Sequence, residues 1–142
     1  MANTPNGSPI SFVNRWTEDI AKDGFTCVPN RLIKNLVALS IEPVEFVLLV
    51  AIESYRYTLE GRPRPSIDTL SKLIDRSPRH TRRMLQDLES KGFIERIRRH
   101  NKTNEYDLVP LILALNDFHL LPNASGHKRP VSTDMDDQTG GH

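Results

Sequence analysis

The chain has 142 residues, of which 37% are hydrophobic and 26% charged, and its formal net charge is +1 at pH 7. A chain of this length can bury one modest core, so a second domain is not expected. The longest apolar stretch, residues 46–52, is too short to cross a bilayer, and the start of the chain does not have the pattern of a signal peptide. A single cysteine, Cys27, excludes an intrachain disulfide and favours a reducing cytoplasm.

Composition divides the chain into three parts. Residues 1–23 are predicted to form a flexible N-terminal arm, in which Phe12, Trp16 and Ile20 have the spacing of one short amphipathic helix. We expect that stripe to pack on the rest of the domain, with a partner chain as the alternative. Residues 24–119 are predicted to form the folded domain, and the polar residues 120–142 a disordered tail.

The first half of the domain predicts a strand, two helices and a loop. Residues 25–28 suit a short strand, and residues 30–39 a helix that follows Pro29. Residues 43–57 are apolar nearly all round, so we expect a central helix buried by the other elements. The proline-rich residues 60–65 predict a stiff loop.

Two helices with clear start signals follow this loop. The two predicted helices are residues 66–74 and 78–91. Ser66 opens the first and Ser77 directly precedes the second, and each serine can cap the free N–H groups of a first turn. Gly92 suits the end of the second helix. One face of the second helix is apolar, and the opposite face carries arginines. With the short connector between them, the two helices predict a helix-turn-helix.

A hairpin and a last helix complete the prediction. Residues 93–100 and 105–109 read as strands around a turn at 101–104, with Ile94 or Ile97 at the strand entrance or beside a bulge. Residues 110–119 predict a helix that completes the core or makes a dimer contact. The expected fold class is therefore mainly α with a small antiparallel β-sheet, a winged helix-turn-helix.

Positive charge is concentrated in the predicted second helix and hairpin. Residues 76–102 carry nine basic side chains against three acidic ones, a net charge of +6, so the remainder sums to −5. A DNA major groove about 12 Å wide admits one helix, whose arginines can donate two hydrogen bonds to guanine. We predict that the DNA-binding residues are Ser66, Thr69, Arg79, His80, Arg82, Arg83, Gln86, Arg98, Arg99 and Lys102.

Each of these residues also has a simpler interpretation. The arginine face of the helix could be an ordinary solvated surface, and the basic hairpin could be a charged edge that prevents sheet-to-sheet aggregation. Ser66 is more often only a helix cap. The alternation of an apolar and a basic face, the capped partner helix and the basic hairpin together favour DNA binding.

Catalytic motifs are absent from the sequence. The five histidines lack metal-ligand spacing, and neither a nucleophile motif nor a glycine-rich phosphate loop is present. We therefore expect no enzyme, no catalytic residues, no cofactor, no metal and no small-molecule ligand.

Several segments resemble a known family. Residues 25–30 (FTCVPN), 66–73 (SIDTLSKL), 77–85 (SPRHTRRML), 88–94 (LESKGFI) and 103–108 (TNEYDL) are similar to the winged-helix domains of phage and plasmid replication initiators and related bacterial regulators. The resemblance covers about residues 24–115. It implies a winged-helix fold, double-stranded DNA as partner and, often, a homodimer on a symmetric or repeated site.

The resemblance leads to one expected function and two alternatives. We expect sequence-specific binding of double-stranded DNA that regulates transcription of a bacterial or mobile-element locus, in the cytoplasm at the nucleoid. The first alternative is a replication-initiation module of a phage or plasmid, although larger initiators carry a further domain after the wing. The second is a winged helix that serves as a protein-interaction scaffold without binding DNA.

Overall fold

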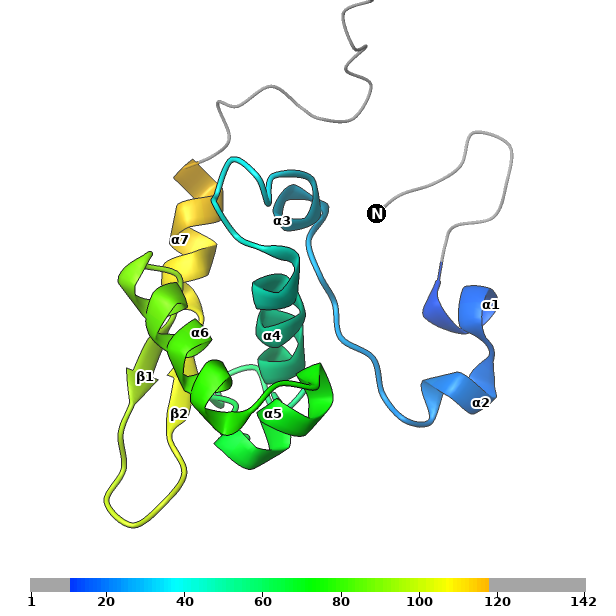
Figure 1. Ribbon diagram of the computed structural model, residues 1–142. Coiled ribbons are helices and arrows are strands. Elements are labelled where there is room, and N and C mark those ends of the chain that lie inside the picture. Colours follow the sequence, from blue (N-terminus) through cyan, green and yellow to red (C-terminus); the bar gives the residue numbers. More distant parts are fainter. Residues whose placement is uncertain (1–10, 118–142) are drawn as a thin grey trace, which may run out of the picture.

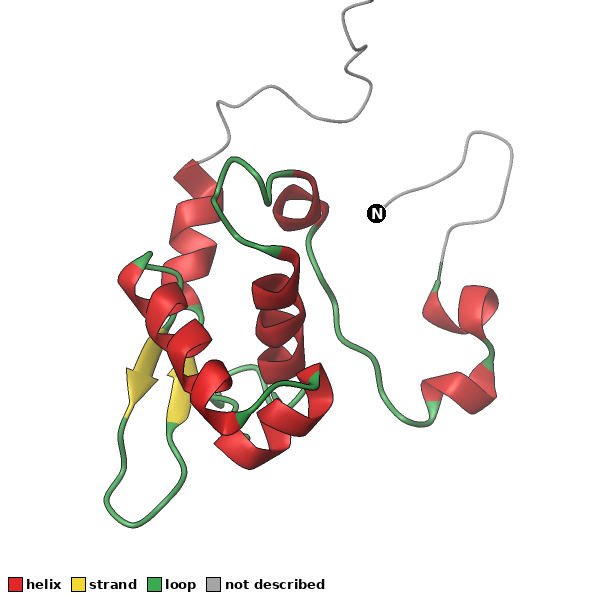
Figure 2. Cartoon of the chain, in the orientation of Figure 1, coloured by secondary structure: helices red, strands yellow, loops and turns green. Residues whose placement is uncertain are grey.

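The computed structural model describes residues 11–117, which form seven helices and one two-stranded antiparallel sheet (Figures 1 and 2). This confirms the predicted mainly helical chain with a small antiparallel sheet. The predicted tail, residues 120–142, and the last two residues of the final predicted helix lie outside the described residues. The elements are α1 (Phe12–Trp16), α2 (Glu18–Ala21), α3 (Asn30–Lys34), α4 (Pro43–Glu53), α5 (Ile67–Ile74), α6 (Pro78–Ser90), β1 (Glu95–Ile97), β2 (Glu105–Asp107) and α7 (Val109–Asp117).

The core lies where α4, α5, α6 and α7 meet the hairpin (Figure 1). The predicted apolar face of α6 is confirmed, because Thr81, Met84, Leu85 and Leu88 are all buried. α7 contributes Leu111 and Leu115, so the last helix does complete the core. The core members are Leu32, Leu39, Ile41, Leu48, Leu49, Ile52, Leu70, Ile74, Met84, Leu85, Leu88, Phe93, Ile94, Tyr106, Leu108, Leu111 and Leu115.

Both predicted serine caps are confirmed. The Ser66 hydroxyl accepts from the Thr69 N–H at 3.0 Å, and the Ser77 hydroxyl accepts from the His80 N–H at 3.1 Å. α5 ends at Asp75, whose φ of 55° is in the left-handed region and turns the chain toward α6. Gly92, with φ of 83°, ends α6 as the sequence predicted.

A buried polar contact joins α5 to α6. The hydroxyl groups of Ser71 and Thr81 lie 2.9 Å apart, and the Thr81 hydroxyl also donates to the carbonyl of Ser77 at 2.9 Å. Both side chains are buried, so these bonds satisfy groups that would otherwise lose their contacts with water. The Ser71–Thr81 bond links α5 to α6, and the Thr81–Ser77 bond lies within the first turn of α6.

The hairpin is confirmed, although each strand has only three residues. Arg96 faces Tyr106 in the antiparallel register. Ile94 is buried and lies just before β1, at the strand entrance, which explains why Ile94 and Ile97 differ in parity. The Tyr106 N–H donates to the carbonyl of Pro63 at 2.9 Å, so the loop before α5 lies beside β2.

The predictions for the N-terminal part were less accurate. Residues 25–28 form no strand, because they pair with no strand among residues 11–117. The single helix predicted through Phe12, Trp16 and Ile20 is also wrong: Thr17 has φ of 94°, which ends α1, and its hydroxyl caps α2. Nor does the stripe join the core, since neither α1 nor α2 contains a buried residue.

Two helices end earlier than predicted, and two faces are more exposed. α3 stops at Lys34 and turns occupy residues 35–40, while α4 stops at Glu53. α4 is not buried all round, because Val47 is exposed. The helical spacing of Ile67, Leu70, Leu73 and Ile74 predicts one buried side of α5, but Leu73 is exposed, so the buried side is narrower than predicted.

Candidate nucleic-acid interface

The exposed face of α6 carries the predicted basic residues. Arg79, Arg83 and Gln86 recur over two turns on the side opposite the buried face, and Arg82 lies on one flank. All four side chains are exposed, as is that of His80 on the other flank. None of the five side chains has a hydrogen bond or an ion pair with any other residue of the described range 11–117. Their polar groups are therefore available to an external partner.

An ion pair joins this helix to the hairpin. The Arg96 guanidinium donates to Glu89 Oε1 from Nε at 3.0 Å and from one terminal nitrogen at 2.8 Å, and the Arg96 backbone N–H donates to Glu89 Oε2 at 3.2 Å. The Arg96 side chain is only 12% exposed. Because Glu89 lies two turns after Arg82 on the same side of α6, the hairpin lies at the Arg82 flank.

The pKa of Glu89 is consistent with its ion pair to Arg96. Burial raises the pKa of its carboxyl, but the hydrogen bonds from the Arg96 side chain and backbone and the charges of Arg96 and Arg98 outweigh burial, so the net pKa lies below its ordinary value of 4.5. Glu89 therefore stays ionised, and its negative charge is matched by Arg96 within the fold.

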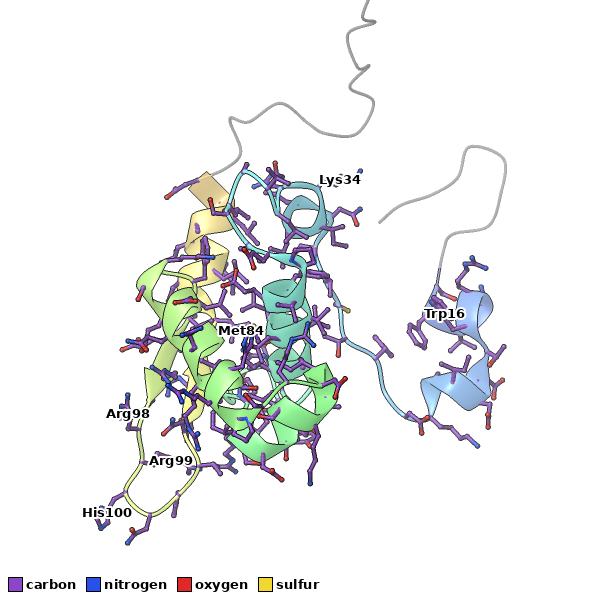
Figure 3. The ribbon with its side chains drawn as sticks, viewed as in Figure 1. Trp16, Lys34, Met84, Arg98, Arg99 and His100 are labelled. Atoms are coloured by element: carbon purple, nitrogen blue, oxygen red, sulfur yellow. The ribbon has the colours of Figure 1, made fainter. Side chains whose placement is uncertain are left out.

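The three predicted residues of the hairpin tip have different surroundings. Arg98 and Lys102 are exposed, and their side chains make no hydrogen bond or ion pair with the described residues. Arg99 folds back instead: its Nε donates to the carbonyl of Thr103 at 2.9 Å, and its guanidinium lies 3.6 Å from Glu105. Figure 3 shows Arg98 and His100 on the outer edge of the hairpin and Arg99 between its two arms. Arg98 and Lys102 are thus the better placed of the three to meet a ligand.

Ser66 and Thr69 lie at the start of α5, half-buried. Their hydroxyl groups are 2.9 Å apart, and Ser66 is also the helix cap. Capping of α5 and the bond to Thr69 therefore account for the contacts of the Ser66 hydroxyl, without a role in DNA binding.

The nine basic side chains of residues 76–102 fall into two groups. Arg76 donates to the carbonyls of Ile74 and Asp75, Lys91 pairs with Glu45, and Arg96 and Arg99 are held as described above. The other five make no hydrogen bond or ion pair within residues 11–117, and we call them the basic face: Arg79, Arg82, Arg83, Arg98 and Lys102. The exposed acids nearest to it in the sequence are Asp87 and Glu95.

Sequence reasoning missed two residues that shape this interface. Glu89 holds Arg96, but the two are seven residues apart across the glycine that ends α6, a separation that no single periodicity connects. Arg62, in the loop before α5, lies 3.7 Å from both Glu105 and Asp107 of β2. In the sequence, the two acidic residues of β2, Glu105 and Asp107, are the feature that could have predicted a basic partner beside that strand.

The described residues contain neither a candidate metal cluster nor a membrane-spanning helix. No group of three or more histidine, cysteine or acidic side chains within residues 11–117 is placed to hold a metal ion. Likewise, no helix in that range has both the length and the apolar character needed to cross a bilayer.

Comparison with known proteins gives no assignment: the chain matches no protein-family model and has no significant match among curated proteins.

Proposed function

We propose that this protein is a winged helix-turn-helix that binds double-stranded DNA in a sequence-specific manner and regulates transcription of a bacterial or mobile-element locus. The proposal rests on the basic face. Five cationic side chains on α6 and the adjacent hairpin make no hydrogen bond or ion pair with the part of the chain that the structure describes, whereas the four other basic side chains between residues 76 and 102 are bonded inside the fold. Unpaired charges gathered on one face suit an anionic partner.

The position of α6 supports insertion into a major groove. Its 13 residues expose one long side, while its opposite side is anchored in the core. The hairpin tip extends past the body at the end where α6 begins, so helix and hairpin can contact one duplex together (Figure 1). In this arrangement α6 is the recognition helix and the hairpin is the wing.

Position along α6 suggests distinct roles for the side chains. Arg79 and Arg83 lie at the middle of the exposed side, where each can donate two hydrogen bonds to guanine O6 and N7. Gln86, on the same side, suits adenine. Arg82, on the flank beside the wing, and Arg98 and Lys102 on the wing itself suit the phosphate backbone or the minor groove.

Selection of bound duplexes from a random pool, followed by affinity measurements over a range of salt concentrations, tests this proposal. We expect one recurrent site, with affinity that falls steeply as salt rises because each phosphate contact releases counterions. A palindrome would favour a transcriptional operator, and tandem repeats would favour an origin of replication.

Two lysine variants give a matched comparison. Lys102→Ala should lower the salt slope by about 1, whereas Lys34→Ala, on α3 at the opposite end of the molecule from the wing (Figure 3), should leave it unchanged. Recovery of no preferred duplex, or binding that does not respond to salt, would overturn the proposal in favour of a protein-interaction scaffold.

A further inference from the structure

The N-terminal arm, here residues 11–25, carries apolar side chains that the core does not bury. Phe12 stacks on Phe25 with ring centroids 4.4 Å apart and lies 6.4 Å from Trp16. Trp16 is 52% exposed and Ile20 is 47% exposed. In Figure 3 Trp16 stands on the arm, well apart from Met84 in the core.

The arm is too short to be stable without a surface to pack against. α1 has five residues and α2 has four, whereas isolated helices shorter than about 12–15 residues are marginal in water. Within residues 11–117 the hydrophobic core includes no residue of either helix. The arm therefore needs a packing surface other than the contacts that it makes within residues 11–117.

The rest of the chain has an apolar pocket that suits such an arm. Its volume is about 350 Å³, and it lies between α3, α4, α7 and residues 26–29. Leu32, Leu49, Leu111 and Leu115 line it, and Ile112 stands at its wall while remaining 53% exposed. The pocket thus offers aliphatic surface of the kind that aromatic side chains bury.

One polar atom in each part also lacks a hydrogen bond. Glu53 lines the pocket, and its Oε1 atom is buried without a hydrogen bond to any of residues 11–117, while its Oε2 atom accepts from Arg56 at 2.6 Å. The indole N–H of Trp16 has no acceptor within the described residues. An indole donor and a carboxylate acceptor are complementary, and Trp usually finds such a partner when it is buried.

We propose that two copies of the chain exchange arms, so that the α1–α2 arm of each copy packs Phe12, Trp16 and Ile20 into the pocket of the other. Residues 26–29, which connect the arm to the body, form a wall of the pocket, so each arm leaves its own body beside a pocket. The arm points away from that body in Figure 1, which leaves both surfaces open. Reciprocal exchange gives a dimer with two-fold symmetry, in which both arms and both pockets are buried. This inference does not depend on DNA binding.

Trp16 is the only tryptophan of the chain and therefore reports on this contact directly. Light scattering coupled to size exclusion should give twice the chain mass of 16.2 kDa. On dilution, tryptophan emission should move to longer wavelength as the mass falls to that of one chain. Both measurements are made without DNA, so they succeed or fail independently of the proposed function.

Variants on each side of the contact test it further. Ile112→Glu in the pocket and Ile20→Glu on the arm should each raise the dimer dissociation constant by about tenfold or more, because a charge would enter an apolar contact. Ile20 lies outside the core, so its variant keeps the test valid if Ile112→Glu fails to fold. Leu73→Glu, at an equally exposed position on α5, should leave the dimer intact.

Three results would overturn the proposal. The first is a single-chain mass at all concentrations with exposed Trp16 emission. The second is a single-chain mass with buried emission that does not change on dilution, which would place the arm in its own pocket. The third is a dimer that Leu73→Glu weakens as much as the two test variants do.

Discussion

Arg96 and Arg98 are two positions apart on the hairpin, yet their guanidinium groups have opposite surroundings. Arg96 is nearly buried and bonded to Glu89, whereas Arg98 is exposed and makes no hydrogen bond or ion pair in the described part of the chain. A guanidinium held by a carboxylate has few donors left for a phosphate. Arg96 therefore positions the hairpin, and Arg98 remains available for binding.

Arg83 provides the sharpest residue-level prediction of the proposed function. Arg83→Ala should cost about 1–3 kcal/mol on the selected duplex and relax the preference at one base pair, because a bidentate contact to a base is lost. Lys102→Ala should instead weaken every duplex by a similar factor, since a phosphate carries no sequence information. Fluorescence anisotropy with the selected site and its single-base-pair variants measures both effects. Equal losses for the two variants on all duplexes would contradict the assigned roles.

The sequence could locate the positive charge but could not show which charges remain unpaired. All nine basic residues between positions 76 and 102 look alike in a count, and only the three-dimensional contacts separate Arg96 and Arg99 from Arg98. Helical spacing did place Arg79, Arg82, Arg83 and Gln86 opposite the buried face, because periodicity alone fixes which side of a helix a residue lies on.

Elements with strong local signals were predicted well. α5 and α6 begin beside serine caps, and α6 ends at a glycine with positive φ, so nearest neighbours along the chain determine their bounds. Residues 25–28 have the composition of a strand, but a strand also needs a partner, and sequence composition does not supply one. The break at Thr17 was missed because a threonine with φ of 94° is rare and has no sequence signature.

The contact between α6 and β1 predicts a dependence on acid. The pKa of Glu89 is lower in the folded protein than in the unfolded chain. The ionised Glu89 side chain therefore stabilises the fold at pH values above its unfolded-state pKa, and this stabilisation is lost as the pH falls through its folded-state pKa. Glu89→Gln should therefore lower the urea midpoint at pH 7, and its difference from the unmodified protein should shrink as the pH falls below the ordinary pKa of 4.5. Glu95→Gln, an exposed acid on the same hairpin, should change the midpoint little at either pH. A difference for Glu89→Gln that does not vary with pH would rule out this linkage.

Across the whole molecule, Lys91 joins the end of α6 to the start of α4. Its ammonium donates to Glu45 Oε1 at 2.8 Å and to the carbonyl of Ser40 at 2.6 Å. Glu45 is buried, and the same Oε1 accepts from the Glu42 backbone N–H at 2.9 Å. Residues about fifty positions apart in the sequence thus meet at one carboxylate, and no local sequence pattern predicts this contact.

Lys91→Met should lower the free energy of unfolding by about 1–3 kcal/mol, because it leaves a buried carboxylate without its cationic partner. Lys72→Met should cost about 0.5 kcal/mol or less, since its pair with Asp68 is exposed on both sides. Urea denaturation at pH 7 compares the two variants. Equal losses would show that the Glu45 contact contributes no more than a surface ion pair.

The base of the hairpin is fastened on both strands. β1 is tied to α6 through Glu89, and β2 is tied through Tyr106 to the carbonyl of Pro63 and through its acids to Arg62. Rotation of the hairpin as a unit would break both attachments, so only the tip beyond them can adjust. If the proposed complex with DNA forms, the body of the protein should therefore lose little conformational freedom, and association should proceed without a slow ordering step.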